Sequence, residues 1–91
     1  MKYEMSKEER LFALKEINKL FKGEKKVDLT GTTISPNNLS EALVELGYVD
    51  SSYDVNLDDY WITFTHTNLS KLIMYYNAES FELTLEVADD D

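Results

Sequence analysis

Few residues in this sequence could carry catalytic chemistry. His66 is the only histidine, and it lies between Thr65 and Thr67, whose hydroxyls become nucleophiles when a neighbouring base activates them. Such a site also needs a carboxylate that orients the histidine, and neighbouring hydroxyls alone do not make a triad. The chain has no cysteine, and its three glycines are too scattered for a phosphate-binding loop. We therefore predict no catalytic residue, no cofactor and no enzymatic activity, with His66 as a surface residue at the end of a strand.

Hard oxygen ligands are concentrated between residues 50 and 59. This segment contains Asp50, Asp54, Asn56, Asp58 and Asp59. Oxygen ligands of this kind suit calcium, but the twelve-residue calcium loop needs a central glycine and a terminal glutamate, and both are missing here. The adjacent carboxylates at positions 58 and 59 do not form an acid and base pair, because neighbouring residues of a strand point in opposite directions. The segment is predicted to be a solvated acidic loop without a metal.

Electric charge is divided unequally along the chain. Residues 1–26 contain eight of the nine basic side chains and five acidic ones, a net charge of +3. Residues 27–91 contain only Lys71 against thirteen carboxylates, a net charge of −12. Direct binding to nucleic acid or to an anionic membrane is disfavoured, because both depend on Lys and Arg. A basic protein partner is favoured, since the negative field would steer its approach; alternatively, the acidity serves solubility alone.

Length and composition indicate one folded domain over residues 1–91, with frayed termini at 1–5 and 88–91. The apolar fraction of 43%, with eleven aromatic residues, is sufficient for a core. No run approaches the roughly 20 apolar residues of a membrane helix, and the first residues lack the pattern of a signal peptide. The absence of cysteine fits a reducing compartment, so we expect a cytoplasmic protein.

Two segments have the signals of helices. Ser6-Lys7-Glu8-Glu9 is a capping box, and the apolar residues that follow recur at helical spacing, which predicts a helix over residues 6–22. Ser35 and Pro36 suit the start of a second helix, and Gly47 suits its end. Both helices present one apolar stripe, so each is expected to pack against a common core.

Three strands are predicted after the second helix, over residues 60–66, 71–76 and 81–87. The segment over residues 27–34 is either an irregular loop or contains a short extra strand at 27–30. Short turns between them indicate an antiparallel meander. The expected fold is therefore α+β, with two N-terminal helices packed on a three-stranded antiparallel sheet in the order α-α-β-β-β. The residues expected to face the helices are Tyr60, Ile62, Phe64, Leu72, Met74, Tyr76, Phe81, Leu83, Leu85 and Val87. The residues expected on the opposite face are Trp61, Thr63, Thr65, Ile73, Tyr75, Glu82, Thr84 and Glu86.

The middle of the chain also resembles a winged-helix domain. The resemblance covers residues 10–76: a first helix, Leu29-Thr30 through Ile34-Ser35-Pro36, the stripe from Leu39 to Leu46, and Gly47-Tyr48-Val49. It implies that the hairpin over residues 60–76 is the wing. The would-be recognition helix carries Asn37, Asn38, Ser40, Glu41 and Glu45 and no basic residue, so DNA binding is not expected even within this fold.

Two surface features point to a function. The first is acidic: on one side of the fold, Glu41, Glu45, Asp50, Asp54, Asp58 and Asp59 would form an anionic ridge that fits a groove built for phosphates. The second is the trio Trp61, Ile73 and Tyr75 on the exposed sheet face, with Glu82 and Glu86 at its rim. Trp and Tyr are frequent anchors of protein interfaces. A second core layer or self-association is the alternative for this trio.

These features favour a small acidic, non-enzymatic protein that binds a basic protein, such as a nucleic-acid-binding enzyme. In size, charge and composition the chain is similar to the small acidic DNA-mimic proteins that phages use against restriction or CRISPR nucleases, which implies an inhibitor whose carboxylates replace phosphates. A homo-oligomeric assembly or structural protein that uses the exposed sheet face is the second hypothesis. A winged-helix-like regulator that acts through protein contacts is the third.

Overall fold

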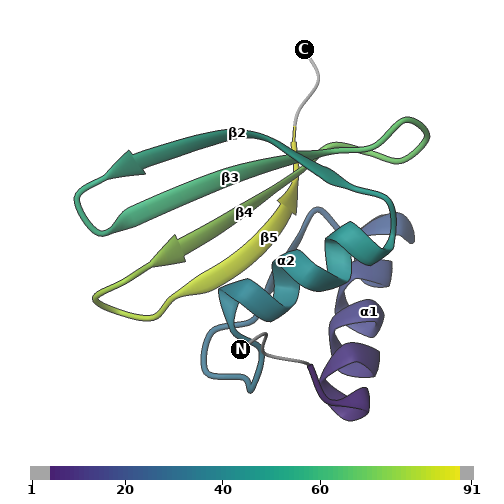
Figure 1. Ribbon diagram of the computed structural model, residues 1–91, viewed down its shortest axis with the longest axis horizontal. Coiled ribbons are helices and arrows are strands. Elements are labelled where there is room, and N and C mark those ends of the chain that lie inside the picture. Colours follow the sequence, from purple (N-terminus) through teal and green to yellow (C-terminus); the bar gives the residue numbers. More distant parts are fainter. Residues whose placement is uncertain (1–4, 89–91) are drawn as a thin grey trace.

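The computed structural model describes residues 5–88, which form two helices and one five-stranded antiparallel sheet (Figure 1). The elements in chain order are α1 (Lys7–Phe21), β1 (Lys26–Asp28), α2 (Pro36–Glu45), β2 (Val49–Asn56), β3 (Asp59–Thr65), β4 (Leu72–Asn77) and β5 (Leu83–Val87). The strand order across the sheet is β1-β5-β4-β3-β2, so β1 and β2 are its two edges. The α+β class is confirmed, and the sheet is larger than the predicted meander.

The two helices begin where their capping residues predict. The Ser6 hydroxyl accepts a hydrogen bond from the Glu9 amide at 3.1 Å, and the Glu9 carboxylate accepts one from the Ser6 amide at 3.1 Å. Glu9 also accepts a bond from the buried side-chain amide of Asn38 at 3.2 Å, so the first turn of α1 is tied to α2. Ser35 caps α2 by accepting from the backbone amide of Asn38 at 3.2 Å.

Both helices pack on one face of the sheet, and the core lies between these two layers (Figure 1). The apolar stripes of the helices meet the inward side chains of β1, β3, β4 and β5 there. The fully buried side chains of this core include Ile17, Leu29, Leu39, Leu43, Tyr48, Phe64, Leu72, Met74 and Leu85. Tyr48 follows α2 after Gly47, and its hydroxyl donates to the Ser70 carbonyl at 2.6 Å, so its polar end is satisfied inside the core.

The strand register confirms most of the predicted division into two faces. Phe64 pairs with Leu72, Met74 pairs with Leu85, and these side chains are buried under the helices. Phe81 is the exception, because it lies in the turn before β5 with a left-handed φ of 63° and is exposed. The prediction that Phe81 starts the last strand and faces the core is therefore wrong.

The prediction that residues 50–59 form a loop is wrong. These residues form most of β2 and a tight turn, and β2 pairs with β3 as the outermost strand of the sheet. The prediction failed because an edge strand that is exposed on both faces can contain many Asp, Ser and Asn residues. The expected short strand at 27–30 exists over Lys26–Asp28 and pairs with β5.

The winged-helix alternative is not supported by this architecture. Residues 29–35 form turns rather than a middle helix, and the hairpin that would be the wing belongs to the five-stranded sheet. The frayed termini expected at 1–5 and 88–91 fall mostly on residues 1–4 and 89–91, which lie outside the described residues. Met5 packs against the core, and the Ala88 amide donates to the Lys71 carbonyl at 2.9 Å.

Candidate protein-interaction site

The face of the sheet opposite the helices is left uncovered by residues 5–88, and we call it the outer sheet face (Figure 1). Cross-strand pairing places Trp61 opposite Tyr75 on this face, and Thr63 opposite Ile73. The rings of Trp61 and Tyr75 are in contact, with centroids 5.5 Å apart and planes inclined by 42°. The predicted trio therefore lies together on two adjacent strands as an apolar group, and all three residues are half-buried rather than fully exposed.

A fixed carboxylate lies beside these rings. The Tyr75 hydroxyl donates to Asp59 Oδ1 at 2.5 Å, and the Asn77 side-chain amide donates to the same oxygen at 2.8 Å. These two donors hold the pKa of Asp59 below its usual value, and the same bond to the Asp59 carboxylate raises the pKa of Tyr75. At neutral pH the carboxylate is therefore ionised and the phenol is protonated. The bond also fixes the orientation of the Tyr75 ring beside Trp61.

The predicted acidic residues separate into two groups rather than one ridge. The register places Asp54 opposite Trp61 and Glu86 opposite Ile73, so these two join Asp59 on the outer sheet face. Asp58 lies in the turn between β2 and β3, and Glu82 lies just before β5. All five of these carboxylates belong to the two hairpins, β2–β3 and β4–β5.

The remaining three acidic residues lie on the side of the helices. Asp50 pairs with the inward-facing Phe64, and Glu41 and Glu45 are exposed on α2. Glu45 forms an ion pair with Arg10 of α1, with 3.2 Å between Oε1 and Nε, so its charge is already compensated within the molecule. The outer sheet face is thus the more coherent of the two acidic regions.

The division of charge along the chain becomes a division between the two hairpins of the sheet and the remainder of the fold. The hairpins over residues 49–65 and 72–87 contain seven carboxylates and no Lys, Arg or His. The basic residues of α1 and of the segment after it lie in the helix layer and at the β1 edge, where Lys26 stands opposite Glu86. A cationic partner would therefore be attracted to the hairpins rather than to the helices.

His66 has a structural role rather than the exposed position expected from the sequence. Its Nδ1 accepts bonds from the backbone amides of Asn68 and Leu69 at 2.9 and 3.2 Å, so Nε2 carries the proton and donates to the Leu46 carbonyl at 3.0 Å. The ring also packs against Tyr48, with centroids 5.0 Å apart. Both ring nitrogens are thus engaged in holding the β3–β4 turn against the end of α2. Within residues 5–88, no three His, Asp or Glu side chains gather as a metal site.

One feature of the surface was missed from the sequence. Tyr53, Tyr60 and Tyr76 form a row on the helix side of the sheet, which we call the tyrosine shelf; each neighbouring pair of rings is 6.3 Å apart. The shelf forms one wall of a hollow of about 450 Å³, and Pro36 and Asn37 at the start of α2 form another. The alternation of Tyr53, Val55 and Leu57 with polar residues was the signal, and reading this segment as a loop concealed it.

Comparison of the chain with protein-family models, with curated proteins and with solved structures finds no match in any of the three. Neither α1 nor α2 has the length and apolar character required to span a membrane. The function is therefore inferred from the geometry of the surface.

Proposed function

We propose that this protein is a non-enzymatic interaction protein whose outer sheet face binds a basic protein. The observation that carries this proposal is the half-buried pair of Trp61 and Tyr75 on the face opposite the helices, with the ionised Asp59 bonded to Tyr75 and Asp54 opposite Trp61. Aromatic residues supply contact area with little loss of side-chain entropy, and carboxylates around them select a cationic partner. Trp61, Ile73 and Tyr75 would then be the central contacts and the acidic residues the rim.

The partner that best fits this surface is a nucleic-acid-handling protein. Such proteins hold phosphates with Lys and Arg, and those side chains respond equally to carboxylates at suitable spacing. Asp54, Asp59 and Glu86 lie on the outer sheet face, and the two hairpins that contribute them contain no Lys, Arg or His, which supports mimicry of a phosphate backbone. A protein of this kind would inhibit its partner by occupying the nucleic-acid groove, in the manner of the phage-type inhibitors that it resembles in size, charge and composition.

Competition with DNA tests this proposal. The immobilised protein is exposed to a nuclease-treated extract of its native host, and bound proteins are released with duplex DNA or with increasing salt. We expect basic nucleic-acid-binding proteins, released by DNA and by moderate salt, since screening weakens contacts between charged surfaces. Trp61→Ser should abolish their capture. The matched control Val44→Ser removes an exposed apolar side chain from α2 and should leave capture unchanged. Equal capture by both variants would reject the outer sheet face as the binding site.

Homodimer formation through the same face is the second candidate function. It is favoured by the position of Trp61, Ile73 and Tyr75 on the face opposite the helices, where a second copy would bury their remaining exposed surface around a two-fold axis. The mass of the protein in solution would then double with concentration, with little dependence on salt, and Trp61→Ser would restore the monomer. A constant monomeric mass at high concentration would eliminate this candidate.

A further inference from the structure

The edge strand β2 has no partner on its outer side among residues 5–88. It ends the strand order of the sheet, and all eight of its residues, Val49–Asn56, are exposed. Its free backbone groups can therefore pair with another extended chain. Proteins usually protect such an edge with lysine, proline or a covering element. The protection that β2 offers is limited to the charges of Asp50 and Asp54 and to a register shift between Asp50 and Ser52. Because this shift lies near the start of the strand, the pairing from Ser52 to Asn56 is regular.

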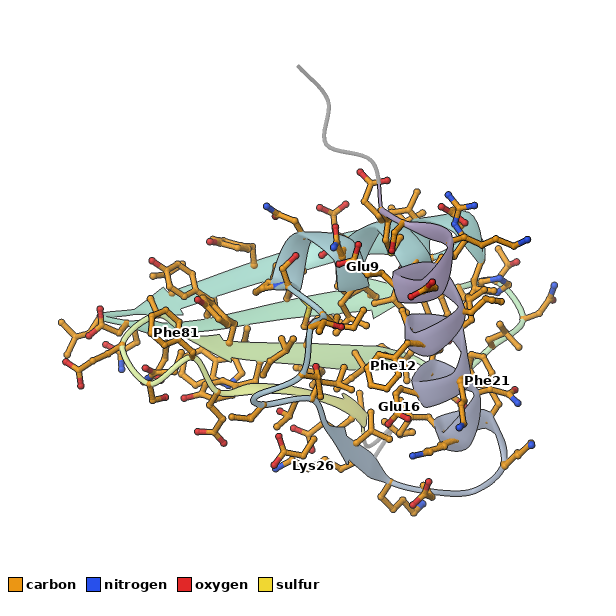
Figure 2. All side chains as sticks on the ribbon, turned by 90° about the horizontal axis from the view of Figure 1, so that it is seen from below. Glu9, Phe12, Glu16, Phe21, Lys26 and Phe81 are labelled. Atoms are coloured by element: carbon orange, nitrogen blue, oxygen red, sulfur yellow. The ribbon has the colours of Figure 1, made fainter. Side chains whose placement is uncertain are left out.

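The tyrosine shelf lies directly beside this edge. Tyr53 of β2 pairs with Ile62, and Val55 pairs with Tyr60, so both β2 side chains lie on the helix side of the sheet. In Figure 2 the sheet extends past both helices at the end that carries Phe81, so the helices do not cover this part. Tyr53 remains 59% exposed, although it is a large aromatic residue packed against Tyr60. An added strand would thus find an apolar surface for alternate side chains.

Two apolar residues at the same end of the sheet combine a strained backbone with exposure to solvent. Leu57 and Phe81 have left-handed φ angles of 57° and 63°, a conformation that L-residues with large side chains rarely adopt. They are 88% and 66% exposed, so neither gains from burial in the core. Their turns are neighbours, because the Ala78 amide donates to the Asp58 carbonyl at 2.8 Å. Strained, exposed apolar residues at one end of a sheet are typical of a binding surface.

Charge identifies the occupant of this surface. The hairpins that build it contain seven carboxylates and no Lys, Arg or His, so an acidic segment would be repelled and a basic one attracted. A second copy would bring its own Asp50 and Asp54 to the same edge, which opposes pairing of β2 with itself. Tyrosine faces also attract Lys and Arg side chains through cation–π contacts.

We propose that β2 accepts a basic, extended segment of a partner protein as a sixth strand of the sheet. Backbone hydrogen bonds along the free edge would provide register, as in other cases of strand addition. Alternate side chains of the added strand would lie over Tyr53 and Val55, and its Lys or Arg residues would reach the shelf and the surrounding carboxylates. This inference rests on the basic partner proposed above, but it uses an edge of the sheet that does not include Trp61, Ile73 or Tyr75.

A peptide of alternating lysine and valine, with four repeats and blocked ends, is a suitable probe. Titration into the isotopically labelled protein, followed by NMR, should shift the amide signals of β2 and protect them from hydrogen exchange. A peptide with glutamate in place of lysine should not bind. A peptide that keeps the lysines but has proline at alternate positions should bind far more weakly, because proline cannot complete the ladder. Equal binding of the proline peptide would overturn strand addition.

Two lysine substitutions separate the surface from the overall charge. Val55→Lys places a cation on the shelf side of β2, whereas the neighbouring Asn56→Lys makes the same change of charge on the outer sheet face. Val55→Lys should weaken peptide binding by about tenfold or more, and Asn56→Lys by much less. Both variants must keep the wild-type pattern of NMR signals outside β2. Equal weakening would show that charge alone attracts the peptide and would overturn the proposal.

The Trp61→Ser variant distinguishes this inference from the proposed function. If the outer sheet face binds the partner and β2 binds its extended segment, Trp61→Ser loses capture of the partner but still binds the peptide at β2. Peptide binding at β2 without capture of any basic partner by the wild type would uphold strand addition and reject the proposed function. If the mass of the wild-type protein in solution doubled and Val55→Lys restored the monomer, the β2 edge would bind a second copy. This result would overturn the proposal of a basic segment.

Discussion

At the scale of single residues, the bond between Tyr75 and Asp59 determines the chemistry of the outer sheet face. Tyr75→Phe removes one of the two donors to the Asp59 carboxylate, so the pKa of Asp59 should rise toward its usual value. Carboxyl-carbon NMR over a pH titration measures this change. Tyr76→Phe is the matched control, because Tyr76 lies next in the chain on the opposite face of the sheet, and it should leave the pKa of Asp59 unchanged.

The same bond has a consequence for the pH dependence of stability. The pKa of Asp59 is lower in the folded protein than in the unfolded chain, so its contribution is present above the unfolded pKa. This contribution is lost as the pH falls through the folded pKa. The acid-induced loss of stability should therefore be smaller in Tyr75→Phe than in the wild type. An unchanged pKa of Asp59 in this variant would contradict the role assigned to the tyrosine hydroxyl.

At the scale of elements, the two helices end in the same way, and only one end is crowded. Gly23 and Gly47 have left-handed φ angles of 115° and 96°, and each is followed by an amide that donates to the carbonyl five residues earlier. A Cβ atom on Gly47 would lie 2.9 Å from His66 Nε2, whereas one on Gly23 would meet no atom within 4 Å.

These two glycines provide a matched pair of variants. Gly23→Ala should lower the free energy of unfolding by about 1 kcal/mol, because alanine is strained in a left-handed conformation. Gly47→Ala should lower it by a further ~1–3 kcal/mol, because the added methyl group must displace the His66 ring. Urea unfolding, followed by the fluorescence of Trp61, measures both. If both variants lost the same free energy of unfolding, the His66 ring would move without an energetic cost, and it would not hold the end of α2.

Local signals were sufficient to predict the helices and the trio on the outer sheet face. The capping residues Ser6 and Ser35 act within one turn of chain, and Trp61 and Tyr75 follow from period-two alternation. The edge strand β2 could not be predicted in this way, because neither of its faces is buried and its composition resembles that of a loop. The alternation of Tyr53, Val55 and Leu57 was a signal for the tyrosine shelf, but Tyr53 reaches Tyr60 only because β2 pairs with β3, which a loop over these residues does not do.

At the scale of the whole molecule, the net charge of −9 opposes the compact state. The structure shows the ion pairs Arg10–Glu45 and Lys19–Glu16 among the described residues, and none of the seven carboxylates of the hairpins over residues 49–65 and 72–87 takes part in either of them. Raising NaCl from about 20 to about 200 mM shortens the screening length from roughly 20 to roughly 7 Å. The midpoint of urea unfolding should therefore increase with salt.

A less acidic variant provides the control for this prediction. Glu41→Lys combined with Asp54→Lys replaces two exposed carboxylates and changes the net charge by four units. Its gain in stability with salt should be smaller than that of the wild type, because there is less repulsion to screen. A midpoint that falls with salt in the wild type would show that attractive pairs, rather than repulsion, dominate the electrostatic free energy.

The unequal lengths of the two boundary strands limit how far copies of this molecule can join. The three residues of β1 offer too short a template for lateral growth, whereas the eight residues of β2 offer a full one. The charges of Asp50 and Asp54 oppose pairing of β2 with a second β2. If high concentration overcame this repulsion, both molecules would use their long edge strand and only the short β1 edges would stay free. Growth would stop at a closed pair, and the protein would be protected from polymerising into filaments.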